Sequence, residues 1–356
     1  MADGVTGGTV PSAGLDAVLS EPARSSPEGT GLPNVRFTGS GWEYFRIWAV
    51  NTALTLLTLG VFSAWATVRT RRYFYGNTRL GGSAFNYTAR PWTILIGRVI
   101  VVGMLVALWF AELVSVAFYL IGLLVVLAMF PWIAVRARAF RLRNSFYRHV
   151  CWGFEGNYAT AAKYYCLGPI VGFLSLGILW PYIAMRRDMF LIRNSRFGTS
   201  ECSIDVTAGQ YYGIYFATFG IFVAALVANA ILVAALPDGF GFLLSVVTWI
   251  PLLLAGVFIK VRLDNLRWSN TTVGGFWLSL DLSFWRMLGL YLSNLVLIVM
   301  TLGAFIPFAK VRVIRYRLGR FRVVRQGAET FFAGPLQTIG AVGAEAGDSF
   351  GLDLGI

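Results

Sequence analysis

The stretch that decides the fold class is Leu113–Val135, which reads LVSVAFYLIGLLVVLAMFPWIAV and is followed at once by Arg136. It contains no Asp, Glu, Lys or Arg. A helix of about 20 apolar residues crosses the roughly 30 Å of hydrocarbon in a bilayer, so this stretch is long enough to span a membrane. The alternative is a buried helix of a soluble protein, which is usually shorter and amphipathic.

Six further runs free of these four residue types make the soluble alternative improbable. They are Ile47–Val68, Val99–Ala111, Tyr164–Met185, Val206–Pro237, Gly239–Ile259 and Met287–Ala309. The run that begins at Val99 is short, but it becomes a full span if the helix starts near Trp92 and the side chain of Arg98 reaches the membrane interface.

The overall composition also indicates a membrane protein. Hydrophobic residues make up 57% of the 356 residues and charged residues 13%, against roughly 45–50% and about 25% in soluble domains. Mean hydropathy is +0.66. These values disfavour a disordered chain, a coiled coil, a disulfide-rich scaffold and an ordinary soluble enzyme. We therefore predict an all-α polytopic membrane protein with about seven apolar segments.

The distribution of charge divides the chain into three regions. Residues 1–34 are net acidic and rich in Gly, Pro, Ser and Thr, and residues 326–356 contain acidic residues but no Lys or Arg. Both are predicted to be disordered tails. The excess of positive charge behind the net charge of +13 lies in residues 35–325, between the apolar runs. This central region is the predicted transmembrane domain.

A short pattern recurs where five of the apolar runs end: an aromatic residue stands four positions before an arginine. These anchor arginines are Arg69, Arg136, Arg186, Arg262 and Arg312. The spacing indicates that each run leaves the membrane at an aromatic residue of the interface and continues as a basic helix. The pattern predicts internal pseudo-repeats, with the five arginines at one membrane depth.

Asparagine follows the anchor arginine by eight positions in four copies, and Arg320 takes that place in the fifth. Asn tolerates the left-handed conformation that often ends a helix, so we expect the basic helices to end there. The segment Thr78–Tyr87 contains Gly-Gly followed by alternating residues, which predicts a short β-element at the membrane surface. Because the last copy lacks Gly-Gly, its strand is in doubt.

A second repeat concerns the topology. Leu-Gly occurs inside three of the runs, at Gly60, Gly177 and Gly303. If all five basic ends face the cytoplasm, as the positive-inside rule predicts, each of these runs must return to the side where it began. Either the three runs are broken at the glycines and re-enter, or all seven span as inverted repeats. In the first case a helix interruption is expected near each glycine.

Two polar positions lie at membrane depth, at equivalent places in the second repeat: Asn51 and Asn294. Two interpretations are open: each Asn forms a hydrogen bond to a neighbouring helix, worth about 1 kcal/mol, or the two residues line a polar cavity. The anchor arginines serve membrane topology alone, or they bind an anionic lipid headgroup or anionic solute.

Catalytic and metal chemistry finds little support in the sequence. His149 is the only histidine, which excludes a two-histidine zinc motif. The cysteines Cys151, Cys166 and Cys202 form no Cys-x-x-Cys pair. We expect no catalytic residue, metal or cofactor. Nucleic acid is not an expected partner, because the basic residues are interleaved with membrane segments.

The motifs together resemble the YjgN-like family of bacterial inner-membrane proteins, a domain of unknown function. The resemblance covers residues 35–325 and is carried by these residues: Phe37-x-Gly39, Tyr44-Phe45, Thr58-Leu59-Gly60, Trp65-Ala66, Arg69-x-x-Arg72-Tyr73, Asn77-Thr78, Gly81-Gly82 and Phe85-x-Tyr87. It implies a multi-pass protein of the bacterial inner membrane and supplies no reaction or ligand.

Three functions stay open at this point. The first is a non-enzymatic membrane protein that binds anionic lipid or scaffolds a partner protein of unknown identity. The second is a carrier or channel for a small solute or a lipid, which can be anionic. The third, an intramembrane enzyme, has no reactive constellation to support it.

Overall fold

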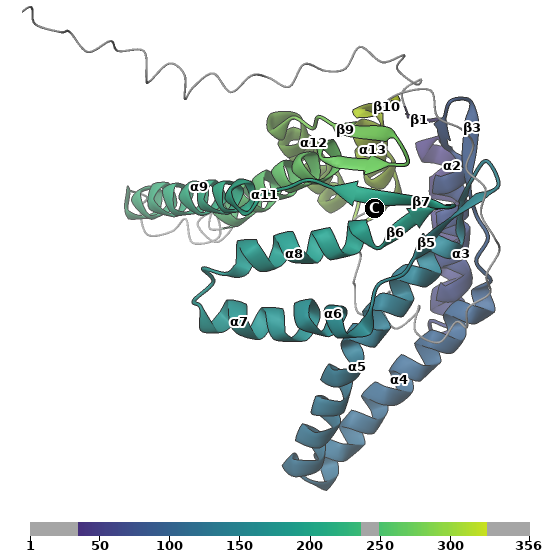
Figure 1. The fold of residues 1–356 in the computed structure, drawn as a ribbon, viewed down its shortest axis with the longest axis vertical. Helices are drawn as coiled ribbons and strands as arrows, with labels where there is room; N and C mark the ends of the chain where they lie inside the picture. Colours follow the sequence, from purple (N-terminus) through teal and green to yellow (C-terminus); the bar gives the residue numbers. More distant parts are fainter. Residues whose placement is uncertain (1–34, 236–248, 326–356) are drawn as a thin grey trace, which may run out of the picture.

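The computed structural model describes residues 35–235 and 249–325 as paired helices joined by short strands (Figure 1). The predicted tails at 1–34 and 326–356 lie outside the described residues, as does part of the apolar region at 236–248.

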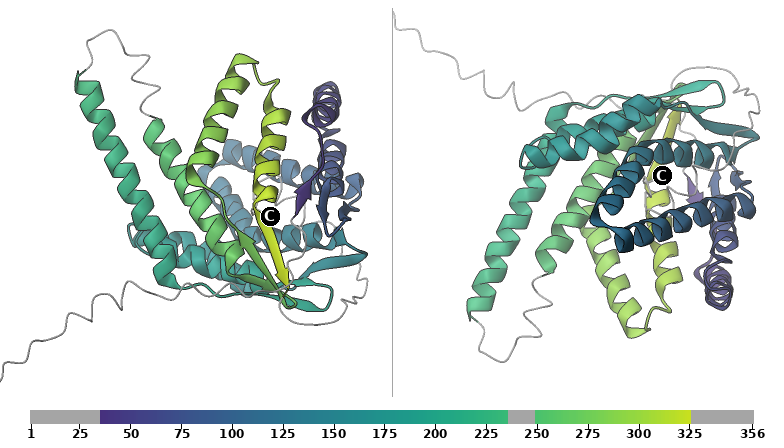
Figure 2. Two further views of the ribbon diagram at one scale, coloured as in Figure 1. Left: turned by 90° about the horizontal axis from the view of Figure 1, so that it is seen from above. Right: turned by 90° about the horizontal axis from the view of Figure 1, so that it is seen from below.

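Five helical pairs follow one another along the chain. They are α2 (Gly41–Leu57) with α3 (Ser63–Gly76), α4 (Pro91–Val114) with α5 (Val116–Arg143), the series α6 (Tyr158–Ala162), η1 (Lys163–Leu167) and α7 (Gly168–Leu174) with α8 (Trp180–Arg193), α9 (Ala208–Ala235) with α11 (Ile250–Ser269), and α12 (Phe284–Met300) with α13 (Ile306–Gly319). In Figure 2 the last two pairs, coloured green to yellow-green, extend from the strands toward the same side.

Every helical pair is followed by one or two strands of a single antiparallel sheet, whose strand order follows the sequence. The strands are β1 (Arg36–Phe37), β2 (Thr78–Leu80), β3 (Ser83–Tyr87), β4 (Ser145–Tyr147), β5 (Val150–Phe154), β6 (Ser195–Phe197), β7 (Ser200–Ile204), β8 (Thr271–Val273), β9 (Phe276–Leu280) and β10 (Phe321–Arg325). The sheet is curled, and neighbouring strands pair even where they belong to different helical pairs.

The sheet corrects two sequence predictions. The chain is mostly helical and the expected short β-elements are present, but they join into one ten-stranded sheet, so the class all-α is too narrow. A lone pair of short strands is marginally stable, which is why successive pairs join edge to edge. The strand placed in doubt exists: β10 pairs with β9 from Phe321 opposite Leu280 to Arg325 opposite Phe276.

The Asn at the end of the basic helices caps them differently from the prediction. Asn77 and Asn144 have φ of −93° and −89°, so they are not left-handed. Instead the side-chain amide of each donates to the carbonyl oxygen four residues earlier, at Tyr73 (2.9 Å) and Phe140 (2.8 Å). The side chain thereby satisfies a carbonyl that the ended helix leaves without a partner.

The helix interruption expected at the Leu-Gly motif is confirmed at all three sites. At the first, α2 ends at Leu57, and both Leu59 (φ 49°) and Gly60 (φ 92°) are left-handed. The amide of Gly60 donates to the carbonyl of Thr55 at 2.8 Å, which is the six-to-one bond of a Schellman cap. The chain then reverses into α3. The same turn occurs at Gly177 and Gly303.

Three helices in the described residues are long and apolar enough to cross a membrane: Pro91–Val114, Val116–Arg143 and Ala208–Leu232. The runs around Gly60, Gly177 and Gly303 are helical hairpins, so the prediction of about seven apolar segments does not translate into seven helices of spanning length. Arg98 also differs from the prediction: it donates to the hydroxyl oxygens of Thr67 (2.8 Å) and Ser63 in α3.

The first and last helical pairs pack against each other. The ring of Phe308 in α13 stacks on Phe45 of α2, with centroids 5.4 Å apart. Arg315 donates to the carbonyl oxygen of Gly39 at 2.8 Å. Since each helix with an anchor arginine leads directly into the sheet, all five basic helix ends lie at the sheet end of the molecule.

Candidate functional site

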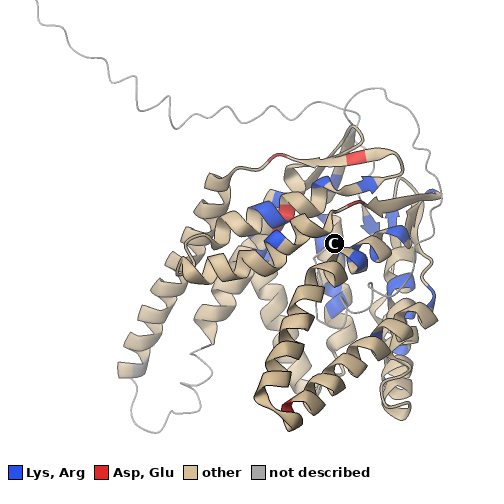
Figure 3. Cartoon of the chain, turned by 60° about the horizontal axis from the view of Figure 1, so that its bottom comes forward, with Lys and Arg blue, Asp and Glu red and all other residues tan. Residues whose placement is uncertain are grey.

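The basic residues gather at the sheet end. Figure 3 shows Lys and Arg concentrated on the strands and on the adjoining helix ends, while the far ends of the long helices carry almost none. Glu112 is exposed near the far end of α4.

Two of the five anchor arginines contact the predicted intramembrane asparagines. Arg69 donates to the side-chain oxygen of Asn51 at 3.4 Å, and Arg312 donates to that of Asn294 at 2.8 Å. Each Asn also donates across its hairpin, to the carbonyl oxygen of Ala66 or of its counterpart in α13, at 3.5 Å. The two groups of residues singled out separately in the sequence therefore form one contact, which ties the two helices of a hairpin together.

The other three anchor arginines rest on the aromatic residue four positions earlier. The guanidinium of Arg136 lies 5.7 Å from the ring centre of Trp132. The remaining two pairs are Arg186 over Tyr182 at 5.2 Å and Arg262 over Phe258 at 5.5 Å. Such contacts attract a cation to the face of the ring. In the described residues no anchor arginine forms an ion pair with a carboxylate.

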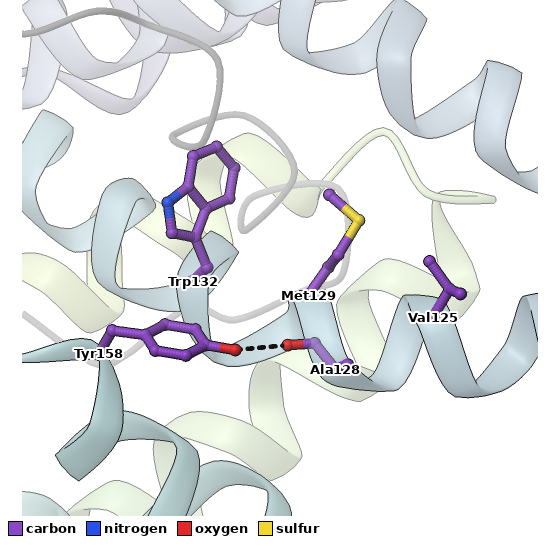
Figure 4. Close-up of a pocket in the computed structure, with 5 residues that line it drawn as sticks. All are labelled: Val125, Ala128, Met129, Trp132 and Tyr158. Carbon is purple, nitrogen blue, oxygen red and sulfur yellow. Dashed lines mark hydrogen bonds between the residues drawn. The ribbon is translucent and has the colours of Figure 1, made fainter.

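An open apolar groove lies beside one of these arginines. It has a volume of about 450 Å³ and is lined by Val125, Ala128, Met129, Trp132 and Tyr158 (Figure 4). The hydroxyl of Tyr158 in α6 donates to the carbonyl oxygen of Ala128 in α5 at 2.9 Å, so the groove joins two helical pairs. Because Trp132 both lines the groove and carries Arg136 on its ring, a guanidinium stands at one end of an apolar surface.

Buried ion pairs form a second polar region between helices. Asp188 accepts from Nε of Arg267 at 2.6 Å and from the hydroxyl of Tyr211 at 2.8 Å. Asp264 accepts from Arg317 at 2.9 Å. By spacing along the sequence, Asp264 could pair with Lys260 or Arg267 on its own helix. In the structure both acids instead pair with an arginine of a neighbouring helical pair.

These pairs have a common register that the sequence analysis missed. In each, an acid two positions after one anchor arginine contacts an arginine five positions after the next anchor. Arg138 occupies the acid's position on α5 and is buried. The sequence contained a signal for this difference. Two positions after the anchor arginine, the second copy has Arg138, whereas the third and fourth copies have Asp.

Cys202 and His149 have different surroundings. Burial raises the pKa of the Cys202 thiol to about 12, so this group stays protonated at neutral pH. His149 is exposed in the turn between β4 and β5, where its φ is 65°. No group of three or more His, Cys, Asp or Glu residues is arranged to hold a metal within 35–235 and 249–325.

The chain is similar to known bacterial proteins. A family described as "Bacterial protein of unknown function (DUF898)" matches residues 33–349. The "Inner membrane protein YjgN" of Salmonella typhimurium is 33% identical over 146 residues, which cover 40% of this chain and 36% of that protein. The protein of the same name from Escherichia coli strain K12 is 43% identical over 51 residues, 14% of this chain and 13% of that protein.

The alignment with the Salmonella protein thus covers little more than a third of that protein's length. No solved structure matches the chain. The resemblance expected from the motifs is confirmed. The similarity and the apolar helices of spanning length together confirm the predicted location in the inner membrane.

Proposed function

The chain belongs to this bacterial family of unknown function, so a function has to be inferred from its structure. We propose that it is a non-enzymatic membrane protein that binds anionic lipid. In this proposal the anchor arginines bind the headgroup phosphates. The ligand class follows from chemistry, since guanidinium is planar and pairs bidentately with phosphate, whereas lysine offers only a point charge.

The single observation that carries the proposal is the apolar groove whose lining residue Trp132 also holds the guanidinium of Arg136 on its ring. An acyl chain fits an apolar surface formed by Val125, Met129 and Trp132, and the phosphate of the same lipid would then meet the guanidinium stacked on Trp132. Arg143 lies two turns further along α5, and its Nη1 atom is buried without a hydrogen-bond partner in the described residues. The same helix thus offers an apolar groove wall and, beyond Trp132, two cationic side chains.

The charge balance supports the same ligand. Arg267 and Arg317, which lie between helices, each have a carboxylate partner within the chain. The anchor arginines have none in the described part, although Arg69, Arg186 and Arg262 are exposed. An unpaired guanidinium beside an apolar surface suits the headgroup layer, where anionic lipids attract basic segments.

The proposed orientation places all five anchor arginines at the cytoplasmic face. The pattern of five basic exits and the positive-inside rule support it. In this arrangement the seven apolar runs form pseudo-repeats, and the three Leu-Gly hairpins enter the membrane and return. In each hairpin the first arm comprises 17 residues and the return arm 14, which is about 26 and 21 Å of helix.

The tips of these hairpins fit a lipid environment. Leu59, Leu176 and Leu302 are 95%, 92% and 97% exposed. A leucine held in the left-handed conformation at a fully exposed tip gains nothing from water, whereas in hydrocarbon its side chain needs no protein partner. Cysteines placed near Arg136 and near Arg186 should both resist impermeant thiol reagents added from the periplasm. Labelling near Arg186 alone would contradict the orientation.

Lipid binding is tested in nanodiscs that contain either phosphatidylglycerol or phosphatidylcholine. The protein should unfold at a higher temperature with the anionic lipid, and Arg136→Gln should reduce that difference. Arg196→Gln serves as the matched control, because Arg196 lies in the sheet and pairs with Glu155 and Glu201. If both variants lose the same part of the temperature difference, the preference for anionic lipid depends on net charge alone.

A second comparison separates phosphate recognition from topology. Replacing all five anchor arginines by lysine keeps the charge but removes the planar donor fork. If the all-lysine protein keeps the full preference for anionic lipid, bidentate recognition is wrong.

Transport of a small solute is the alternative, and the two intramembrane asparagines are its test. Asn51 and Asn294 use their side chains on arginines and backbone carbonyls inside their hairpins, which favours a bracing role. Solute flux in liposomes that disappears in the Asn51→Leu, Asn294→Leu double variant would favour transport instead.

A further inference from the structure

Arg138 is the most unusual charged residue in the described part of the chain. It lies in α5 with 4% of its surface exposed. Its Nε atom is fully buried without a hydrogen-bond partner, and its guanidinium makes no ion pair within 35–235 and 249–325. A buried guanidinium without a counter-charge is among the costliest arrangements in a protein.

The surroundings of Arg138 add to the cost of burying its charge. Arg141 lies close enough on the same helix to repel it, and the nearby uncharged groups include the hydroxyl of Tyr165 and the thiol of Cys202. The hydroxyl of Tyr165 is itself close to Arg187 and to Asp188.

The carboxylate close to Tyr165 already has its own partners. Asp188 is bound by Arg267 and by the hydroxyl of Tyr211, and Arg187 approaches its other oxygen only to 3.9 Å. The surroundings of the Tyr165 hydroxyl therefore contain Arg138, Arg141 and Arg187 but a single Asp, which is already bound by Arg267.

The register of the interhelical ion pairs explains why Arg138 has no partner. Asp188 and Asp264 each face an arginine five positions after the next anchor. The corresponding position for Arg138 is Leu191, which belongs to an apolar cluster. The chain has therefore replaced an internal ion pair by an arginine on one side and a leucine on the other, which leaves a buried cation that must find its anion elsewhere.

The π-helical turn η1 supplies a second unpartnered group at the same place. A π-turn inserts one residue into a helix and re-aims the side chains around it, and such turns are frequent at functional sites. Tyr165 lies in this turn, and its hydroxyl oxygen is buried without a hydrogen-bond partner. Nε of Arg187 is likewise buried and without a partner. Three donor groups from α5, η1 and α8 thus lack acceptors in one neighbourhood.

From this arrangement we infer that Arg138, Tyr165 and Arg187 form a binding site for a compact oxyanion of the phosphate type. The two guanidinium groups and the phenol supply only donors to such an anion, which is acceptor-only when fully ionised. Arg187 is half-buried, so the cluster reaches the surface at its side chain. The site is separate from the groove at Arg136 and uses none of the anchor arginines.

The anion can come from solution or from a lipid headgroup, and the test distinguishes the two. In the first arm, full-length protein in neutral detergent is unfolded by heat in inorganic phosphate and in chloride at equal ionic strength. In the second arm, phosphate-free samples receive short-chain phosphatidylglycerol or phosphatidylcholine. Each arm compares the wild type with Arg138→Leu, and Arg196→Gln controls for the loss of one charge.

The wild type should gain stability from phosphate, and Arg138→Leu should lose that gain without being less stable than the wild type in chloride. The control should keep it. If only phosphatidylglycerol gives an Arg138-dependent gain, the anion is a headgroup. Arg136→Gln is expected to alter the lipid arm alone, so failure of the lipid groove is recognised separately.

Arg138→Lys covers the case in which Arg138→Leu does not fold. It retains the charge but loses the donor fork, and we expect it to bind phosphate about tenfold more weakly, measured by equilibrium dialysis. Equal phosphate binding in the wild type, in Arg138→Lys and in Tyr165→Phe would overturn the inference. So would an unchanged phosphate gain in Arg138→Leu.

Discussion

The ion pair between Asp188 and Arg267 should be a main contributor to the packing of α8 on its neighbours. Asp188 is 5% exposed and accepts from Nε of Arg267 at 2.6 Å and from the hydroxyl of Tyr211 at 2.8 Å. Removing one partner of a buried pair costs about 3 kcal/mol or more because the other charge stays buried. Loss of the tyrosine hydrogen bond adds about 1 kcal/mol. We expect Asp188→Ala to lower the free energy of unfolding by about 4 kcal/mol.

The measurement is reversible unfolding in mixtures of SDS and neutral detergent, followed by circular dichroism. Glu201→Ala is the matched control, because Glu201 forms an exposed pair with Arg196 at 3.1 Å, and exposed pairs contribute about 0–1 kcal/mol. The double variant Asp188→Leu, Arg267→Met should recover to within about 1 kcal/mol of the wild type. If Asp188→Ala costs no more than Glu201→Ala, the buried pair does not hold these helices together.

Three further outcomes are expected. Gly177→Ala should cost about 1–2 kcal/mol in the same assay because φ is +85° there, whereas Gly213→Ala, in a helix with free space around it, should not destabilise. At pH 8 a maleimide should label Cys151 well before Cys202, since a pKa of about 12 leaves about one thiolate in ten thousand; equal rates would contradict this. Asn294→Leu should cost about 1–2 kcal/mol by removing the 2.8 Å contact with its arginine. Asn294→Asp should cost less, because it keeps the acceptor for Arg312 and loses only the 3.5 Å bond to the carbonyl of Ala309.

The features that the sequence predicted correctly are those decided within one turn of the chain. A glycine after Leu59 or Leu176 is a local signal, because the backbone there must be left-handed whatever packs nearby. The ends of the basic helices were predicted for the same reason. The detail at Asn77 was wrong because the side chain competes for a carbonyl of the preceding turn, and that contact depends on the rotamer rather than on residue type.

The features that the sequence did not reveal depend on contacts between helical pairs. Strands of two to five residues gave no sign that they continue one another into a single sheet. The partner of Asp264 lies on the next hairpin, in Arg317, although an arginine on its own helix was equally suitable by spacing. Asn51 and Arg69 were each noticed, but only the hairpin at Gly60 shows that they meet.

The length of the Leu-Gly segments illustrates the same limit. By composition these runs are apolar enough to span a bilayer, so the sequence left open whether each run re-enters at its glycine or spans. The reversed direction after the glycine shows that each forms a hairpin. Hydropathy indicates whether a segment prefers hydrocarbon or water, and it does not show whether the chain crosses the membrane or turns back.

The central claim, that an anionic lipid occupies the groove beside Arg136, is tested most directly by photocrosslinking. Phosphatidylglycerol with a photoactivatable acyl chain is incorporated into nanodiscs with the full chain, and the adducts are mapped by mass spectrometry. The account predicts adducts concentrated at Met129, Trp132 and Tyr158 that excess phosphatidylglycerol, but not phosphatidylcholine, displaces. Adducts spread evenly over the exposed faces of α4, α5 and α9, with no difference between the two competitors, would contradict it.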